Sequence, residues 1–266
     1  MVARLADSIA VITGGARGIG AEIARVFAQE GAFVIVTDIL DDEGSAIARS
    51  IKGRYYHLDV SSESEWDALV SILEHDYKKV DVVVNNAGIT GFEGNTGPQD
   101  PENAGLESWH KVHAVNLDGV FLGCKAAIRL MKKHGGSIIN LSSRSGMVGI
   151  PGAAAYASSK AAVRNHTKTV ALYCAEMGYK IRCNSINPAA ILTPMWDATL
   201  GLDQTSRLKA MADISAGIPL GHMGEPIDVA YAALYLASKE AKYLTGTEII
   251  IDGGILAGSS ARPRKE

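Results

Sequence analysis

Short apolar runs alternate with amphipathic stretches along this chain of 266 residues, and this alternation limits the possible folds more than any other feature. Runs that are apolar on both faces suit a parallel sheet covered by helices on both sides. The pattern therefore predicts an α/β fold, doubly wound, with a seven-stranded and mostly parallel sheet. The expected strands are 8–13, 31–37, 54–58, 80–84, 136–141, 180–187 and a last one that begins at Glu248.

A glycine-rich turn with Gly14, Gly18 and Gly20 joins the first expected strand to the helix that follows. Glycines let the backbone approach a pyrophosphate, while free N–H groups and the positive end of the helix dipole receive its charge. An ordinary tight turn is the alternative, since the spacing Gly-x-x-x-Gly-x-Gly differs from GxGxxG. In this alternating pattern the turn indicates a Rossmann-like sheet that binds a dinucleotide.

Asp38 ends the second expected strand, 18 positions after Gly20. A carboxylate there can accept hydrogen bonds from an adenosine ribose and repel a 2′-phosphate, which favours NAD over NADP. Arg17 in the glycine turn opposes this preference because it could pair with that phosphate. We give Asp38 more weight because its carboxylate would face the phosphate directly. A purely structural role for Asp38, at a strand end or helix N-cap, stays open.

The next candidate residues follow the strand at 80–84 and lie in the helix beyond it. Asn85-Asn86-Ala87-Gly88 follows that strand, where ligands of parallel sheets bind, and a Gly- and Pro-rich loop covers 89–106. A helix is expected at 107–133, and its inward face includes Phe121. Asn116 lies on or near that face, so it must be hydrogen-bonded, either as a bridge in the core or as a site residue.

Tyr156 and Lys160 lie four positions apart in an expected helix at 156–177. At this spacing both side chains project from one face, and a cation beside a phenol favours the phenolate. A lowered pKa would suit the tyrosine to general acid–base chemistry. Alone, the pair is more typical of a solvated helix face.

Composition and charge exclude several classes of protein. With 47% apolar residues, we expect the whole chain, 1–266, to form one dinucleotide-binding domain, with an apolar lid at about 194–222 and a disordered tail at about 259–266. A net charge of −3 without a long basic run argues against nucleic acid, and no apolar stretch is long enough for a membrane span.

The cysteines and histidines suggest neither disulfides nor a metal site. Three cysteines without a CxxC spacing fit a reducing cytoplasm, and the N-terminus lacks an apolar signal core. Only His110 and His113 share a helical face, and no HExxH is present, so no metal is expected.

Taken together, these motifs resemble the short-chain dehydrogenase/reductase family over nearly the whole chain. Asn116, Ser143 and Tyr156-x-x-x-Lys160 are similar to its catalytic tetrad, and Ser143 is preferred to Ser142 because it lies 13 residues before the tyrosine, the usual family spacing. The family's Pro-Gly after the sixth strand is replaced here by Pro188-Ala189. The resemblance implies cofactor contacts from Gly14, Arg17, Gly18, Ile19, Gly20, Asp38, Asp59, Val60, Asn86, Ala87, Gly88, Tyr156, Lys160, Pro188, Ile191 and Thr193.

The resemblance also implies a mechanism. Tyr156 would remove the hydroxyl proton of an alcohol, or return it to a ketone, as hydride passes between the substrate and a nicotinamide. Ser143 would hold the substrate oxygen. Lys160 would lower the pKa of the tyrosine and hold the nicotinamide ribose, and in the family Asn116 supports a water that passes protons to the lysine.

The segments 59–66 and 181–195 are most similar to those of bacterial hydroxysteroid and cyclic-alcohol dehydrogenases, which implies NAD(H)-dependent interconversion of an apolar secondary alcohol and its ketone. A 3-oxoacyl (acyl-carrier) reductase is the alternative enzyme, although it normally uses NADPH and a basic entrance. A dinucleotide-binding regulator without activity is the alternative outside enzymes. Family members are commonly tetramers or dimers built on the helices at about 107–133 and 156–178, so a homotetramer or homodimer is expected.

Overall fold

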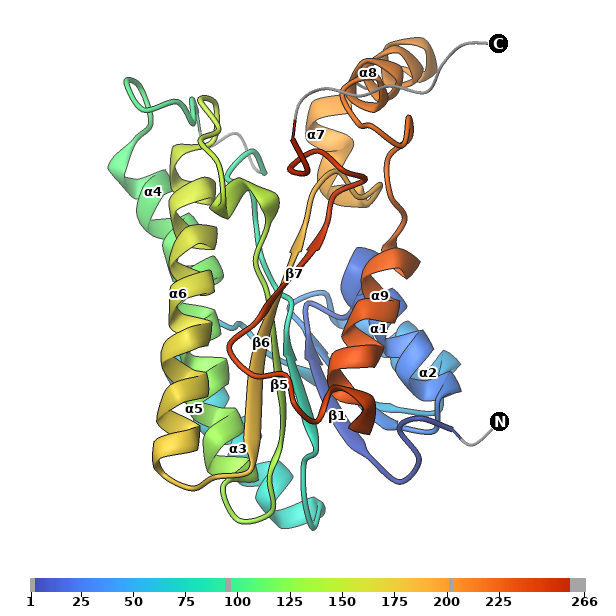
Figure 1. Ribbon diagram of the computed structural model, residues 1–266, viewed down its shortest axis with the longest axis vertical. Coiled ribbons are helices and arrows are strands. Elements are labelled where there is room, and N and C mark those ends of the chain that lie inside the picture. The colour runs from blue at the N-terminus through green and yellow to red at the C-terminus, as the bar shows by residue number, and fades with distance from the viewer. Residues whose placement is uncertain (1–2, 94–96, 201–202, 259–266) are drawn as a thin grey trace.

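The computed structural model describes residues 3–93, 97–200 and 203–258, and a seven-stranded sheet forms its centre (Figure 1). The strand order is β3-β2-β1-β4-β5-β6-β7, and every pair of neighbouring strands is parallel. The predicted doubly wound α/β fold is therefore confirmed. The strands are β1 (Ile9–Thr13), β2 (Phe33–Asp38), β3 (Arg54–His57), β4 (Val82–Asn85), β5 (Gly136–Leu141), β6 (Ile181–Pro188) and β7 (Glu248–Ile251).

The strand order reverses direction between β1 and β4, and this reversal places the site. From β1 the chain first adds β2 and β3 on one side, and then continues with β4 to β7 on the other. A crevice opens at the carboxyl ends of such a pair of strands, and ligands of this fold class bind there. Thr13, the last residue of β1, and Asn85, the last of β4, mark that edge.

Helices cover both faces of the sheet, as expected for buried parallel strands. One core, with Phe27 of α1 and Leu234 of α9, lies between the sheet and helices α1, α2 and α9. The other core, with Trp66 of α3 and Met131 of α5, lies under α3, α5 and α6. The helices are α1 (Gly18–Gln29), α2 (Asp41–Ser50), α3 (Glu63–Asp76), α4 (Leu106–His113), α5 (Gly119–Met131), α6 (Ala154–Glu176), α7 (Asp197–Leu200), α8 (Gln204–Ala216) and α9 (Pro226–Ala237).

The helix expected at 107–133 is present, but a π turn, η1 (Ala114–Asp118), divides it into α4 and α5. The prediction that Phe121 points inward is wrong, since half of its surface is exposed. The inward face of α5 instead contains glycines: a methyl group added at Gly119 would lie 2.8 Å from a Val60 methyl. The helix packs too close to the sheet for an aromatic ring to fit beneath it.

The apolar segment predicted to form a lid is largely helical in its described part, which agrees with a helical excursion packed on the domain. It consists of a short 3-10 turn, η3 (Pro194–Trp196), followed by α7 and α8. In Figure 1 these helices stand above the carboxyl end of the sheet. The tail at 259–266 lies outside the described residues.

None of the helices in the described ranges combines the length and hydropathy that crossing a membrane requires.

The tight packing of α5 leads to a stability prediction at Gly123. A methyl group there would lie 2.0 Å from Oδ1 of Asn85, whose amide donates to Asn140 at 2.8 Å. Alanine ordinarily favours a helix over glycine by about 1 kcal/mol. We nevertheless expect Gly123→Ala to lower the free energy of unfolding by about 1–3 kcal/mol, because the buried amide must move. Denaturant unfolding measures this change.

Gly149→Ala is the matched control, because a methyl group added at Gly149 meets no atom within 4 Å. If the free energy of unfolding of Gly123→Ala equals or exceeds that of the native protein, α5 and β4 can move apart at little cost in stability.

Candidate active site

The carboxyl ends of β1 and β4 are joined by the side chains of Thr13 and Asn86. Asn86 Nδ2 donates to the carbonyl oxygens of Thr13 and Gly14, each at 2.9 Å. In the other direction, Thr13 Oγ1 accepts from the backbone N–H groups of Asn86 (3.0 Å) and Ala87 (3.1 Å). The segment after β4 is therefore fixed against the glycine turn. Sequence reasoning did not select Thr13, although a polar residue at the buried end of an apolar strand is a usable signal.

Gly14, Gly18 and Gly20 form a glycine cradle at this edge, and its shape tolerates no side chain at two of the three positions. Gly14 has φ +63°, and a methyl group on it would lie 2.7 Å from the Ala87 Cα. A methyl group on Gly20 would lie 2.1 Å from the carbonyl oxygen of Gly14. Backbone N–H groups at the start of α1 are thus accessible at close range, which fits the pyrophosphate of a dinucleotide.

The other residues predicted in the turn point elsewhere. Arg17, at the N-cap of α1, is exposed, and Ile19 packs against the core under α1 and α9. Gly18 faces the segment after β6, since a methyl group on it would lie 3.5 Å from Cγ2 of Thr193. The structure therefore brings Thr193 to the glycine cradle, as the resemblance implied for a cofactor site.

Asp38 lies beside the glycine turn, and its carboxylate is held by backbone donors. Oδ2 accepts from Ala16 N at 3.0 Å, and Oδ1 accepts from Ile39 N at 2.8 Å and Leu40 N at 3.1 Å. These bonds show the structural role that the sequence left open. They also fix a partly exposed carboxylate beside the turn, where a ribose of the dinucleotide would approach.

Asp59 and Val60 follow β3 and are tied into the start of α3. The Asp59 carboxylate accepts from the N–H and the hydroxyl of Ser61, at 2.9 and 2.7 Å. Val60 is buried and its carbonyl oxygen accepts from the Trp66 indole at 3.0 Å. Both residues lie at the carboxyl edge of the sheet, next to the strand that carries Asp38.

Asn116 is fully buried in the π turn and bridges two segments. Its Oδ1 accepts from Ile89 N at 2.8 Å, and its Nδ2 donates to Ile89 O at 2.9 Å and to Ser159 Oγ at 3.2 Å. Of the two roles that the sequence left open, the side chain shows the bridge in the core. Gly88 lies between this bridge and the lysine: a methyl group on it would lie 3.1 Å from Asn116 Oδ1 and 3.3 Å from Lys160 Nζ.

Ser143, Tyr156 and Lys160 come together where β5 ends and α6 begins. The Ser143 side chain favours the ionised form of the Tyr156 phenol and so lowers its pKa, and its hydroxyl donates to the Pro188 carbonyl oxygen at 3.4 Å. Ser142, the alternative serine, donates instead to the Lys160 carbonyl oxygen at 2.7 Å. The geometry therefore brings Ser143, and not Ser142, to the tyrosine.

The pKa of Tyr156 differs from the expectation that a neighbouring lysine lowers it. Burial raises the pKa of this phenol above its usual value, and the neighbouring Ser143 side chain only partly opposes the shift. Lys160 Nζ lies 5.8 Å from the centre of the tyrosine ring and donates to the Leu141 carbonyl oxygen at 2.9 Å. Burial lowers the pKa of Lys160 to about 8.

The segment after β6 completes this edge. Pro188 is the last residue of β6, and Ala189 N donates to Ile251 O of β7 at 2.9 Å. Ile191 turns its side chain into the core, while its backbone pairs with Gly224. Of the two residues predicted here to contact a nicotinamide, only Thr193 therefore has a partly exposed side chain.

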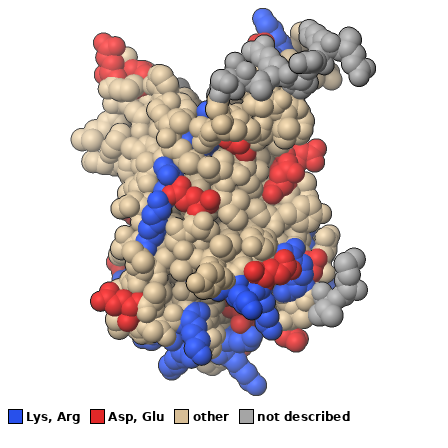
Figure 2. Space-filling view, viewed as in Figure 1, with Lys and Arg blue, Asp and Glu red and all other residues tan. Residues whose placement is uncertain are grey.

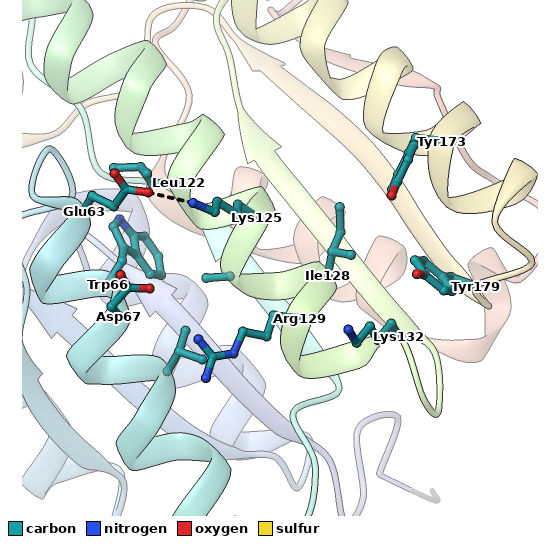
Figure 3. A pocket seen from close by; sticks show the side chains of 12 residues that line it. Glu63, Trp66, Asp67, Leu122, Lys125, Ile128, Arg129, Lys132, Tyr173 and Tyr179 are labelled. Carbon is teal, nitrogen blue, oxygen red and sulfur yellow. Dashed lines mark hydrogen bonds and ion pairs between the residues drawn. The ribbon is translucent and has the colours of Figure 1, made fainter.

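A separate groove of about 290 Å³ lies between α3, α5 and the last part of α6 (Figure 3). Its lining is mostly charged and aromatic, and includes Trp66, Arg129 and Tyr173. Tyr173 lies 17 residues after Tyr156 on α6, a distance of about 25 Å along a helix at 1.5 Å per residue. The groove is therefore remote from the tyrosine. Among the residues that the structure describes, no group of three or more His, Cys, Asp or Glu side chains is suited to hold a metal ion.

Comparison with known proteins agrees with this arrangement. Residues 14–256 match a family model described as enoyl-(acyl carrier protein) reductase. The chain is 41% identical over 263 residues to the NADP-dependent (R)-specific alcohol dehydrogenase of Lentilactobacillus kefiri, covering 97% of this chain and 100% of that protein. It is also 41% identical to the 3-alpha-(or 20-beta)-hydroxysteroid dehydrogenase of Mycobacterium bovis, covering 97% and 93% of the two chains.

A solved structure supports the same assignment. The crystal structure of a short-chain type dehydrogenase/reductase from Mycobacterium marinum superposes with a TM-score of 0.84 at 31% identity, covering 97% of this chain and 98% of that one. The fold, the order of the motifs and these full-length similarities agree. The chain belongs to the short-chain dehydrogenase/reductase family, whose members use a nicotinamide dinucleotide.

Proposed function

We propose that the protein is an NAD(H)-dependent oxidoreductase that interconverts an apolar, cyclic or steroid-like secondary alcohol and its ketone. The observation that carries the proposal is the placement of Ser143 and Lys160 beside Tyr156, on the same sheet edge as the glycine cradle. The two relatives named above, an alcohol dehydrogenase and a hydroxysteroid dehydrogenase, support the reaction and the substrate class.

The proposed roles follow from the positions of the side chains. A bound nicotinamide would supply or accept the hydride. Tyr156 transfers a proton to or from the substrate oxygen, and Ser143 donates a hydrogen bond to that oxygen, which orients it and stabilises developing charge. Lys160 lies below the ring and is anchored on the Leu141 carbonyl oxygen, so its ammonium can hold a ribose hydroxyl of the dinucleotide. Asn116, whose side-chain amide is held by Ile89 and Ser159, supports a water that passes protons to Lys160.

We propose that the whole chain forms one dinucleotide-binding domain and that the segment at 194–222 is an apolar lid on it. The substrate would bind under this lid. Met195 and Leu208 are exposed there, by 38% and 60%, although they are large and apolar. Covering such side chains with a carbon skeleton removes apolar surface from water.

We propose NAD as the cofactor because of Asp38. Its carboxylate is fixed beside Ala16 of the glycine turn, and would repel a 2′-phosphate on the adenosine ribose. The relative from Lentilactobacillus kefiri is NADP-dependent, and the exposed Arg17 would favour NADP as well.

The alternatives receive less support. A 3-oxoacyl reductase would need a basic entrance for its carrier protein. On the face shown in Figure 2, Lys and Arg gather mainly at the lower end, whereas the carboxyl edge of the sheet lies at the upper end. A regulator without activity would not need a phenol, a hydroxyl and an ammonium placed together.

We further propose a cytoplasmic location, since Cys124, Cys174 and Cys183 are buried free thiols.

We propose that the protein is a homotetramer or homodimer that packs through α5 and α6. Large apolar side chains on these helices face solvent: Phe121 is 50% exposed, Leu172 71% and Tyr173 45%. Burying such a surface against a second copy is favourable.

The first prediction concerns the proton. Tyr156→Phe keeps the ring but removes the hydroxyl, so we expect kcat for a secondary alcohol to fall at least about a hundredfold. Binding of NAD, measured by calorimetry, should change little. Tyr173→Phe on the same helix is the control and should retain full activity. Turnover by Tyr156→Phe at the native rate would refute the proposed mechanism.

The second prediction concerns cofactor choice. The native enzyme should turn over faster with NAD than with NADP in a steady-state assay. Asp38→Ser keeps a hydrogen-bond acceptor but removes the charge, and should raise kcat/KM for NADP about tenfold or more. Asp42→Ser, an exposed acid at the start of α2, should not. A native preference for NADP would contradict the assignment of Asp38.

The third prediction concerns assembly. Light scattering should give the mass of a tetramer or dimer for the native protein, and Phe121→Glu should lower it by placing a charge in the contact. Leu208→Glu introduces the same charge on α8 and should leave the mass unchanged. A monomeric native protein would rule out this assembly.

A further inference from the structure

An ion pair between α6 and β7 has no role in the mechanism above. Arg164 lies one turn beyond Lys160 on α6, and Glu248 is the first residue of β7. Nε and Nη2 of Arg164 both reach Glu248 Oε2 at 2.7 Å, and the two side chains are only 24% and 15% exposed. Two charge-assisted contacts that are shielded from water in this way hold both side chains in one geometry.

The third nitrogen of the guanidinium reaches the turn that begins at Ser143. Arg164 Nη1 donates to the Gly146 carbonyl oxygen at 2.6 Å. Gly146 ends a 3-10 turn, η2 (Arg144–Gly146), and Ser143 is the N-cap of this turn. Because Glu248 fixes the other two nitrogens, Nη1 is aimed at this carbonyl as one prong of a planar fork. Arg164 therefore connects the turn after Ser143 to β7.

The conformation of Ser143 depends on this turn. Ser143 Oγ accepts from Ser145 N at 3.1 Å, and Ser143 O accepts from Gly146 N at 3.0 Å. The turn is also packed on α6, since a methyl group on Gly146 would lie 2.6 Å from the carbonyl carbon of Lys160. The hydrogen bond from Arg164 holds the turn in this close contact. A displacement of the turn would therefore move the Ser143 hydroxyl relative to the helix that carries Tyr156.

Lys168 provides an internal comparison on the same helix. Its Nζ lies 2.6 Å from the other oxygen of Glu248, Oε1. Lys168 is one turn further along α6 than Arg164, away from the contact between Gly146 and Lys160. Burial raises the pKa of Glu248, but the two cations outweigh this effect and bring it below its usual value, so the carboxylate stays charged. Removing the Lys168 charge would therefore alter the surroundings of Glu248 without removing the hydrogen bond to the turn.

We propose that Arg164 is a positioning residue, which is held by Glu248, fixes the turn after Ser143 and so places the Ser143 hydroxyl for the reaction at Tyr156. The inference rests on the proposed function, because it concerns how one residue of that site is held. A hydroxyl that must donate to a substrate oxygen loses its effect quickly when it is displaced, since hydrogen bonds depend steeply on distance and angle. Arg164 acts through Gly146, so it needs no contact with the substrate.

The experiment removes the guanidinium and keeps an unbranched side chain in its place. Arg164→Met leaves Glu248 paired with Lys168, and we expect it to lower kcat for a secondary alcohol about tenfold, with little change in the binding of NAD by calorimetry. Single-turnover measurements with excess enzyme follow the slow variants. Lys168→Met is the matched control, because it removes one cation from the same carboxylate, and it should keep the native kcat.

A double-mutant cycle separates the positioning of Ser143 from a general structural role. If Arg164 acts through Ser143, Arg164→Met must lower kcat much less in a Ser143→Ala background than in the native protein. A general loss of packing would lower kcat by the same factor in both backgrounds. The loss of a positive charge that acts on Tyr156 directly would also do so.

The pH profile gives a second readout. Burial raises the pKa of Tyr156, and the Ser143 side chain opposes this shift. Displacement of the serine should therefore raise this pKa further. Because oxidation of the alcohol needs the phenolate, the rising limb of kcat/KM should move to higher pH in Arg164→Met. Lys168→Met should leave the limb in place, and Arg164→Met should not move it further in the Ser143→Ala background.

The outcomes distinguish the two proposals. If the native enzyme oxidises no secondary alcohol, the proposed function fails and the inference falls with it. If it does, and Arg164→Met retains the native kcat or lowers it equally in both backgrounds, the inference on Arg164 is wrong while the function stands. Should Arg164→Met fail to fold, Arg164→Lys decides, because one ammonium cannot reproduce the fork that reaches both Glu248 and Gly146. Its kcat should still fall, with less effect in the Ser143→Ala background, and a native kcat would overturn the inference.

Discussion

The close approach of backbone to backbone between the ends of β1 and β4 is the constraint on which the rest of the site depends. The Asn86 amide fixes this approach by donating to the carbonyl oxygens of Thr13 and Gly14. A side chain at Gly14 or Gly20 would force the turn away from Ala87 or from itself. Any such shift would be transmitted to Gly88, which is packed against both Asn116 and Lys160. The glycines therefore set how closely the glycine cradle approaches the segment at Gly88, which packs against α6.

Burial and the neighbouring polar groups act in opposite directions on Tyr156 and Lys160 of α6. Burial raises the pKa of Tyr156 and lowers that of Lys160, so both groups are driven toward their neutral forms. The Ser143 side chain favours the phenolate, and the Leu141 carbonyl oxygen, which accepts from Lys160 Nζ, favours the ammonium. A neighbour at the end of β5 thus favours the charged form of each group, against the effect of burial. The ionisation of Tyr156 and Lys160 therefore depends on the position of this strand end relative to α6 as well as on their four-residue spacing.

Much of this arrangement could be predicted from the sequence because it depends on local patterns. Buried strands such as Val82–Asn85 are continuous apolar runs, and the glycine spacing reflects backbone geometry. The prediction for Phe121 is wrong because hydropathy alone does not show which face of α5 meets the sheet, or that Gly119 and Gly123 allow its close approach there. The partners of Asn116, Ile89 and Ser159, depend on contacts between distant segments, which no local pattern encodes.

The same reasoning explains why the reaction is easier to infer than the substrate. The chain leaves the sheet edge after Ile191 and returns at Gly224. Leu192 N donates to Gly224 O at 2.8 Å, and Gly224 N donates to Ala190 O at 2.9 Å. The segment between them begins and ends at one place, so its length and composition can change without altering the pairing of β6 with β7. Thr193 still reaches Gly18 from that anchored base. The cofactor side is therefore constrained by the sheet, whereas the surface over the substrate is free to vary.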